Sequence, residues 1–425
     1  MNVIYFPGKI AKPYTDAWLS LILGEVQLFL LMFPYQDLAS ALPQFNILES
    51  VFSLISDGLI ALSFVYFLHS RQLNFNMKNH GWLLMVMGYF FISSMWTDPY
   101  MEKEKIFYLS RTSFCIIQTL VIIQVFSERA SDAFLDALKK IAIVITILSF
   151  LFILVFPDAS NWVVKDPVRD ESFFASPNNL GQFLAIAFIL INFYKTNRIQ
   201  WFFLILLNAV LVYQAIRCNS MTSQAGVVIC LVAFLFKPLL KPLYFLVILL
   251  GICIPIFTHQ YLGNNADRKI LGDRDLTFTG RSEVWDVLQN DLKRNHHDIF
   301  GFGAGGYWGN EPGKLQAIPV STIGNLEWAR QGHNGYLDIR VMGGIVGLAI
   351  VVFFLFNFIN FIYKKKELPT VALFIPFIIL FNNITESTLF RNKHFYFVIF
   401  MLLYWFITRI NDDDTRHLQN NNFEA

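Results

Sequence analysis

Charged residues and cysteines are scarce in this chain of 425 residues. Aspartate, glutamate, lysine and arginine make up 15% of the sequence, whereas a typical soluble domain carries about 25%. The formal net charge is +2 and the chain has no basic arm or tail, so nucleic acid is not expected as a partner. The 4 cysteines lack the spacing of zinc ligands or of a disulfide framework, and each lies in or beside an apolar run. We interpret Cys115, Cys218, Cys230 and Cys253 as small buried hydrophobic residues.

Apolar residues are abundant instead: hydrophobic types make up 55% of the chain, and long apolar runs recur along it. A membrane-spanning helix needs about 20 mainly apolar residues, so the sequence predicts an all-α polytopic membrane protein. The first run is alternatively a signal peptide, because 39–41 (ASA) resembles a cleavage site, but Glu25 and Gln27 inside the run favour a retained span. We predict about 12 transmembrane helices, at residues 17–34, 46–68, 81–96, 106–126, 139–156, 180–194, 201–217, 223–237, 242–258, 334–362, 369–382 and 394–410.

The basic residues of the short loops predict the orientation, because lysine and arginine are enriched on the cytoplasmic side of membrane proteins. One set of loops carries most of them, namely Lys9, Lys12, Arg71, Lys78, Arg129, Lys139, Lys140, Lys195, Arg198, Lys237, Lys241, Lys364, Lys365 and Lys366. The opposite set carries only Lys103, Lys105, Lys165, Arg169, Arg391 and Lys393. This distribution places both termini in the cytoplasm and the long segment 259–333 outside.

This topology divides the chain into four parts. Residues 1–258 form an N-terminal transmembrane bundle of about nine helices, and residues 259–333 form a large loop on the outer side. Residues 334–410 form the C-terminal transmembrane helices, and residues 411–425 a cytoplasmic tail. A loop as long as 259–333 with structure of its own is usually functional, so candidate residues are sought there first.

Three stretches of this loop carry local signals. LTFTGRSEVWDVLQNDLK (276–293) predicts a turn at 279–280 and then a helix that has Val284, Leu288 and Leu292 on one face. IFGFGAGGYWG (299–309) is rich in glycine and aromatic residues, so its backbone can approach a ligand or a neighbouring helix closely. No strand–turn–helix unit surrounds these glycines, which argues against a dinucleotide-binding fingerprint. The third stretch, RQGHNGYLDIRVMGGIVGLAI (330–350), gathers charged and polar residues at the entry to an apolar span.

Four residues are candidates for chemistry, two in the long loop and two in the predicted spans. Arg281, at a predicted helix start, could bind phosphate together with free backbone N–H groups; the alternative is a surface arginine. His333 could act as a general base where membrane meets water; the alternative is a solvated histidine. Arg111 and Arg217 lie within or at the end of apolar spans, where charges usually face a cavity or a partner, with snorkelling to the interface as the alternative. A cavity lined with arginines would suit a polyanionic headgroup, such as the diphosphate of a lipid carrier.

Five motifs follow one another over about residues 170–350: FFASPNNLGQFLA (173–185), NSMTSQAG (219–226), TGRSEVW (279–285), GFGAGGYW (301–308) and WARQGHNGYLDIRVMGGIVGL (328–348). In this order, the chain resembles the O-antigen ligase and polymerase superfamily of bacterial membrane glycosyltransferases. It is most similar to the exopolysaccharide polymerase branch of that superfamily. The first five predicted spans resemble the superfamily only in being hydrophobic.

The resemblance implies a fold, a location and a reaction. The fold would be a GT-C-like all-α bundle of about twelve spans with a large periplasmic loop, in the bacterial inner membrane. The reaction would move a glycan from a polyprenyl-diphosphate carrier to a sugar hydroxyl, without a nucleotide sugar, a cofactor or an obligatory metal. The implied partners are the lipid-linked oligosaccharide, the lipid bilayer, a chain-length regulator and a flippase.

The resemblance also implies roles for individual residues. Arg281 matches the loop arginine that contacts the diphosphate, and His333 matches the histidine proposed to activate the acceptor hydroxyl. Asn334 and Tyr336 extend the histidine motif and would be structural or substrate-positioning residues. Trp308 in the glycine–aromatic motif is a further candidate for binding the substrate.

One position departs from the superfamily. Many members carry a second arginine within a Ser-x-Ser-Arg-Thr pattern, and this chain has Met221 at that point. Arg217 lies about one helical turn earlier and is a candidate replacement. Arg330 would guide the anionic donor, whereas Arg340 would snorkel from the first turns of its span. The glycines at 343, 344 and 347 would allow close helix packing behind the site.

Three functions fit these observations. The leading hypothesis is a polymerase that joins lipid-linked repeat units into a capsule, O-antigen or exopolysaccharide. A ligase that moves finished glycan to lipid A core or to protein uses the same donor chemistry and differs only in its acceptor. A flippase or transporter commonly has a similar number of spans, but it would show two similar halves, and the sequence has no corresponding pair of interrupted spans.

Overall fold

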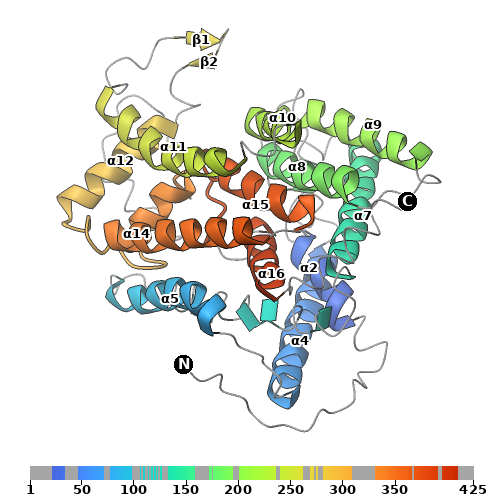
Figure 1. Ribbon diagram of the computed structural model, residues 1–425, viewed down its shortest axis with the longest axis horizontal. Helices are drawn as coiled ribbons and strands as arrows, with labels where there is room; N and C mark the ends of the chain where they lie inside the picture. The colour runs from blue at the N-terminus through green and yellow to red at the C-terminus, as the bar shows by residue number, and fades with distance from the viewer. Residues whose placement is uncertain are drawn as a thin grey trace.

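The structure is a computed structural model that describes most of the chain (Figure 1). The described residues are 22–33, 46–70, 77–97, eleven helical residues between 106 and 126, 133–157, 172–174, 176–194, 201–235, 240–261, 269–271, 274–275, 281–308, 331–365, 368–390 and 395–409. Arg111 and Arg330 lie outside them, so their predicted roles stay predictions.

The described chain is almost entirely helical. Its helices are η1 (Ile22–Val26), α2 (Gln27–Met32), α4 (Asn46–Ser70), α5 (Met77–Ser93), η3 (Ser94–Trp96), α7 (Ala133–Val155), α8 (Pro177–Phe193), α9 (Trp201–Cys218), α10 (Met221–Leu235), α11 (Leu240–Tyr261), α12 (Arg281–Arg294), α14 (Gly335–Lys364), α15 (Thr370–Asn382) and α16 (Phe395–Arg409). Two short strands, β1 (Lys269–Leu271) and β2 (Arg274–Asp275), pair antiparallel in the long loop.

Several of these helices suit a membrane. Four are long and apolar enough to cross one: Ala133–Val155, Trp201–Cys218, Leu240–Thr258 and Gly335–Lys364. Shorter apolar helices occupy other predicted spans, including Pro177–Phe193, Thr370–Asn382 and Phe395–Thr408. The structure therefore agrees with an all-α membrane protein, while the number of about 12 spans stays a prediction.

The outer surface of the bundle is strongly apolar. On α9, for example, Phe202 is 72% exposed and Ile216 is 67% exposed. Monomeric soluble proteins rarely expose large continuous apolar surfaces, but lipid covers them in a membrane. Cys253 also lies on an exposed surface, whereas Cys218 is buried. The interpretation of the cysteines as buried residues is therefore correct for Cys218 and wrong for Cys253.

The bundle is centred on α8 and on the pair α14 and α5. Helix α8 packs against α7, α9, α10 and α15, and it is buried on most of its surface. Helix α14 packs along α5, as Figure 1 shows at the lower left. A Cβ on Gly343 would lie 3.0 Å from the Tyr89 ring, and one on Gly347 would lie 2.8 Å from it. These two glycines therefore let α5 approach α14 closely, as predicted for the glycines of this span.

Helix α14 is interrupted at Gly344, and the loop segment 298–303 fills the interruption. Gly344 has φ 65° and ψ −166°, which is non-helical. The N–H groups of Phe302 and Gly303 donate to carbonyls of 341 and 342 at 2.8 and 2.9 Å, and carbonyls of 298 and 299 accept from 345 and 346 at 2.8 and 3.1 Å. These bonds satisfy backbone groups that the helix cannot pair itself. The glycine–aromatic segment therefore approaches a neighbouring helix.

Helix α12 lies over the end of the bundle, next to α11 and α14. Val284, Leu288 and Leu292 form its buried face together with Trp285, and they pack against Leu337 of α14 and its neighbours. The helix predicted to follow the turn at 279–280 is thus confirmed, and it begins at Arg281. Its burial fixes where the first residue of α12 points.

Candidate functional site

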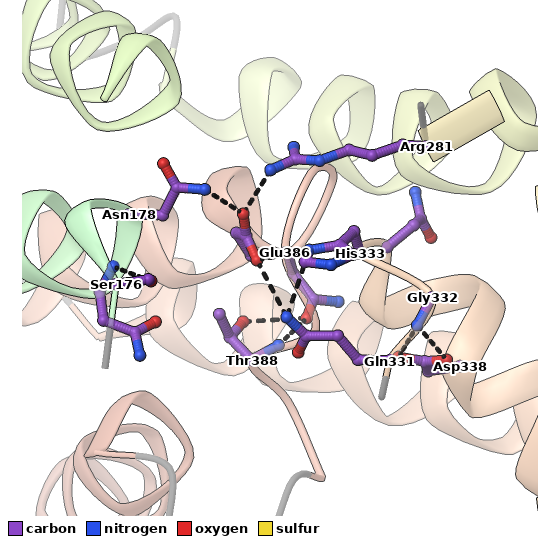
Figure 2. Close-up of polar contacts among 12 residues, drawn as sticks. Ser176, Asn178, Arg281, Gln331, Gly332, His333, Asp338, Glu386 and Thr388 are labelled. Atoms are coloured by element: carbon purple, nitrogen blue, oxygen red, sulfur yellow. Dashed lines mark hydrogen bonds and ion pairs between the residues drawn. The ribbon is translucent and has the colours of Figure 1, made fainter. Parts of the chain in front are cut away.

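A buried carboxylate, Glu386, joins the two residues that the sequence singles out for chemistry. Its Oε1 lies 2.5 Å from Nη2 of Arg281, and its Oε2 lies 3.1 Å from Nδ1 of His333. Asn178 donates from Nδ2 to Oε1 at 2.7 Å, and Gln331 donates from Nε2 to Oε2 at 3.4 Å. Figure 2 shows these side chains converging on Glu386 from different segments of the chain. We call these five residues the Glu386 cluster.

Ends of separate helices bring the cluster together. Arg281 is the first residue of α12, and His333 precedes α14. Asn178 lies in the first turn of α8, which begins at Pro177 after the N-cap Ser176, as expected for proline at a helix start. Glu386 lies in the loop between α15 and α16. The cluster therefore sits at one end of the bundle, which we call the site end.

The loop that carries Glu386 is shaped by one asparagine. Oδ1 of Asn383 accepts hydrogen bonds from the N–H groups of Thr388 at 3.1 Å and Leu389 at 3.0 Å, and from the Thr388 hydroxyl at 2.9 Å. The backbone carbonyl of Asn383 accepts from the N–H of Gly335 at 2.9 Å. These bonds turn the loop back on itself, so that Glu386 points into the bundle and is 5% exposed.

A second set of bonds fixes the turn that carries His333. The N–H of Gly332 donates to Oδ1 of Asp338 at 3.0 Å, and its carbonyl accepts from Nε1 of Trp285 at 2.7 Å. Nε1 of Trp308 donates to the same Oδ1 at 3.0 Å. His333 itself has φ 49°, in the left-handed region that few non-glycine residues adopt. The backbone conformation is therefore held from both sides and aims the imidazole at Glu386.

Asn334 is a structural residue in this arrangement. Its Oδ1 caps α14 by accepting from the N–H of Leu337 at 2.8 Å. Its Nδ2 donates to the carbonyls of Gly251 at 3.0 Å and Ile384 at 2.7 Å. With 0% of its surface exposed, Asn334 ties the start of α14 to α11 and to the Glu386 loop. Of its two predicted roles, the geometry supports the structural one.

The charge state of Glu386 follows from its neighbours. Burial raises the pKa of its carboxyl, but the charges of Arg281 and His333 and the hydrogen bonds from His333 and Asn178 outweigh burial and lower the pKa to about 2. Glu386 is therefore an ionised carboxylate at neutral pH and can only accept hydrogen bonds. Because the carboxylate only accepts, Nδ1 of His333 is the donor in their hydrogen bond, and in the neutral form of the ring Nε2 is the nitrogen with a free lone pair.

The cluster contains one group that can bind an anion, Arg281, and one that can accept a proton, His333. Among the described residues, Arg281 has a hydrogen bond to Glu386 alone. This bond uses Nη2 of the guanidinium. A guanidinium has five N–H donors and can serve an anion with the others. His333, oriented by a carboxylate, has the geometry of a general base. The arrangement can thus hold an anionic leaving group and accept a proton from a nucleophile.

The other predicted substrate-binding residues lie around the cluster rather than in it. Trp308 is half-buried and holds Asp338, as described above. Tyr336 is 1% exposed and packs over Gly251 with its hydroxyl near the Leu380 carbonyl, behind the site. Arg217 is half-buried in the last turn of α9 and is not among the residues bonded to Glu386. Substrate contacts of these three residues stay predictions.

The structure gives Arg340 a contact that was not predicted, and it adds Glu386 to the candidate site. Arg340 was expected to snorkel, but Nη2 lies 2.8 Å from Oδ1 of Asp298 and helps to hold the glycine–aromatic segment on α14. Glu386 lies outside all of the motifs that point to chemistry in the sequence. The available signal was FNNITESTLF (381–390), a polar stretch with one carboxylate between two apolar runs, on the same predicted side as the long loop.

Two comparisons with known proteins leave the site without an assignment. A scan against protein-family models finds no match, and a search of curated proteins finds none either. Among the described residues, no group of three or more His, Cys, Asp or Glu side chains could hold a metal ion. The motifs and the geometry of the Glu386 cluster are therefore the features that point to a function.

Proposed function

We propose that this protein is a membrane glycosyltransferase that polymerises polyprenyl-diphosphate-linked oligosaccharide repeat units. The product would be a capsule, O-antigen or exopolysaccharide made at the periplasmic face of a bacterial inner membrane. The observation that carries the proposal is the Glu386 cluster, which joins Arg281 and His333 at one end of a bundle of apolar helices. An arginine and a carboxylate-oriented histidine are the groups that transfer from a diphosphate requires.

The chemistry is a single displacement. The acceptor hydroxyl attacks the anomeric carbon of the donor and gives its proton to Nε2 of His333, and a new glycosidic bond forms. The bond between the anomeric carbon and the phosphate oxygen breaks, and the diphosphate leaves with the electron pair. The charge that develops on the leaving oxygen is stabilised by Arg281. The expected stereochemical outcome is inversion, because no covalent enzyme intermediate forms.

Glu386 supports both partners in this scheme. It holds the imidazole in the tautomer that leaves Nε2 basic, as the carboxylate does in hydrolase triads. It also fixes the direction of the Arg281 side chain before the donor arrives, which reduces the ordering needed at the moment of reaction. Asn178 supplies a further donor to the carboxylate and keeps it charged.

The proposal is tested with the purified protein in lipid nanodiscs and a lipid-linked repeat unit. A ladder of lengthening products is expected from a polymerase. A single transfer to lipid A core or to a protein acceptor would identify the ligase instead, and movement of the lipid-linked unit across a vesicle membrane without transfer would identify a flippase.

Two variants and one control tie the activity to the site. Replacing His333 or Arg281 with alanine should abolish the ladder while the protein remains in the membrane. Lys293→Ala is the matched control, because it removes an exposed cation from the same helix as Arg281. Normal chain lengths in both site variants would refute the assignment of the site.

A further inference from the structure

A cavity of about 350 Å³ lies in the wall of the bundle beside the Glu386 loop. Its lining comes from α5, from the helical residues between 106 and 126, from Phe390 and from Phe397 of α16. Among its described lining residues, Ser113 alone has a polar side chain. Phe91 and Ile92 border it and are 49% and 55% exposed. The cavity is therefore apolar and reaches the lipid-facing surface of the bundle.

Phe390 connects the cavity to the Glu386 cluster. It lies four residues after Glu386 along a described stretch of chain, which limits their Cα separation to about 14 Å. Phe390 has φ 59°, an unusual value for a bulky residue. Its ring lies 5.3 Å from the rings of Phe90 and Phe397. A backbone outlier that aims an aromatic ring at a cavity wall suggests a functional constraint at this position.

Gly88 keeps part of the cavity open. This glycine lies inside α5, where alanine would favour the helix more. A Cβ placed on Gly88 would meet nothing within 4 Å, so the residue borders empty space and not a packed neighbour. A volume of this size is within the range of sites that bind small molecules.

We propose that this cavity binds the polyprenyl chain of the donor, next to its diphosphate. The inference rests on the proposed function, because the Glu386 cluster must hold the diphosphate for the chain to enter here. A hydrocarbon chain is the ligand that an almost purely apolar lining favours. The exposed rim lets the chain enter sideways from the bilayer, while the glycan remains in water at the site end.

The occupant is a donor chain and not a bulk phospholipid because of where the cavity lies. Any apolar groove on the lipid-facing surface contacts acyl chains, but this one has a wall on the segment that follows Glu386 directly. A polyprenyl chain is covalently attached to the group that Arg281 would hold. Binding of head and chain is then mutually reinforcing, because the second contact becomes intramolecular.

Photocrosslinking tests the proposal without requiring transfer. The probe is a polyprenyl phosphate with a diazirine in its first isoprene units, added to the full-length protein in nanodiscs. Mass spectrometry should locate the label on 84–92, Phe390 or Phe397, and unlabelled polyprenyl diphosphate should reduce it. Equal reduction by the same concentration of phosphatidylglycerol would show that the cavity holds ordinary membrane lipid and would overturn the proposal.

Two glycine variants of α5 provide a matched pair. Gly88→Leu fills the cavity and should reduce labelling and raise the KM for the donor roughly tenfold, with kcat little changed. Gly81→Leu adds the same side chain two turns earlier on the same helix, where a Cβ also meets nothing within 4 Å. Gly81 does not line the cavity, so its variant should label as the wild type does.

The outcomes separate the two proposals. If the wild type builds a glycan ladder while Gly88→Leu keeps the wild-type KM and labelling, the cavity assignment is wrong and the proposed function stands. If the probe labels the cavity and Gly88→Leu blocks it, but no lipid-linked glycan is transferred, the proposed function is wrong and the cavity is still a polyprenyl site.

Discussion

At the scale of single residues, Glu386 sets the charge as well as the geometry of the site. Its carboxylate neutralises Arg281, so a donor diphosphate meets a pair with no formal net charge. Glu386→Gln removes that neutralisation and replaces one of the two accepting carboxylate oxygens with an NH2 donor, so the His333 tautomer is held less firmly. We expect the KM for the donor to fall, and kcat to fall on the order of 100-fold because general-base catalysis is weakened. Steady-state kinetics with a lipid-linked repeat unit measure both constants.

The separate changes in KM and kcat of Glu386→Gln distinguish a positioning role of Glu386 from a packing role. A residue that only packs would change the stability of the protein and the amount of active enzyme, with an unchanged KM. Glu386→Asp keeps the charge and should recover part of the lost kcat. An unchanged kcat in Glu386→Gln would show that Glu386 does not orient the base.

The same carboxylate predicts how stability depends on pH. Burial raises the pKa of this carboxyl in the folded protein, but Arg281 and His333 outweigh burial and lower the pKa from its ordinary value of 4.5 to about 2. Because the pKa of Glu386 is lower in the folded than in the unfolded protein, its ionised carboxylate stabilises the folded state above pH 4.5. This stabilisation is lost as the pH falls towards 2 and the carboxylate is protonated. The contribution is on the order of 3 kcal/mol when complete.

Thermal unfolding in detergent between pH 3 and pH 7 measures this contribution. The wild type should lose apparent Tm steeply at the acid end, and Glu386→Gln should start from a lower Tm at pH 7 and lose less. Parallel curves for the two proteins would mean that Glu386 is not held ionised by its neighbours.

At the scale of elements, the close packing of the glycine–aromatic segment was predictable from the sequence, but its packing partner was not. The sequence predicts correctly that 299–309 can approach a partner closely, but it leaves open whether that partner is a ligand or a helix. The structure pairs the segment with the interrupted α14 through the backbone. Main-chain hydrogen bonds can form whatever the side chains are. The amino-acid composition of the segment therefore could not identify its partner.

Gly301 tests this docking. It has φ 71°, and a Cβ there would lie 2.5 Å from the backbone nitrogen of Gly344. Gly301→Ala should therefore destabilise the protein by more than about 1 kcal/mol, through strain and through separation of the segment from α14. Gly81→Ala is the control: its Cβ meets nothing within 4 Å, and alanine in a helix should be neutral or stabilising. Equal apparent Tm values for the two variants would contradict the docking.

At the scale of the whole molecule, hydropathy predicted the helices well and the site only in part. Apolar runs mark helices because each run must be buried or face lipid along its length. The Glu386 cluster depends instead on contacts across 105 residues to Arg281 and 208 residues to Asn178. No local pattern encodes such contacts, so Arg281 and His333 were found through motifs while their common partner was not.

The basic residues of the loops predict which side of the membrane the site faces. The helix ends that the positive charges assign to the outer side, at Trp96, Pro177 and Gly335, meet at the site end. After the interruption at Gly344, helix α14 continues to Lys364 over about 20 residues, or about 30 Å, which matches the hydrocarbon thickness of about 30 Å. The two ends of α14 must therefore lie on opposite sides if this helix spans the membrane.

Cysteine labelling in intact cells tests that arrangement. In a variant without the 4 native cysteines, Lys293→Cys places an exposed thiol near the site end, and Lys364→Cys places one at the far end of α14. A membrane-impermeant maleimide should label position 293 in intact cells and position 364 only after the inner membrane is permeabilised. The reverse pattern would put Arg281, Glu386 and His333 in the cytoplasm. A polymerase that acts on the periplasmic face would then be excluded, because its base and its anion site would lie on the wrong side of the bilayer.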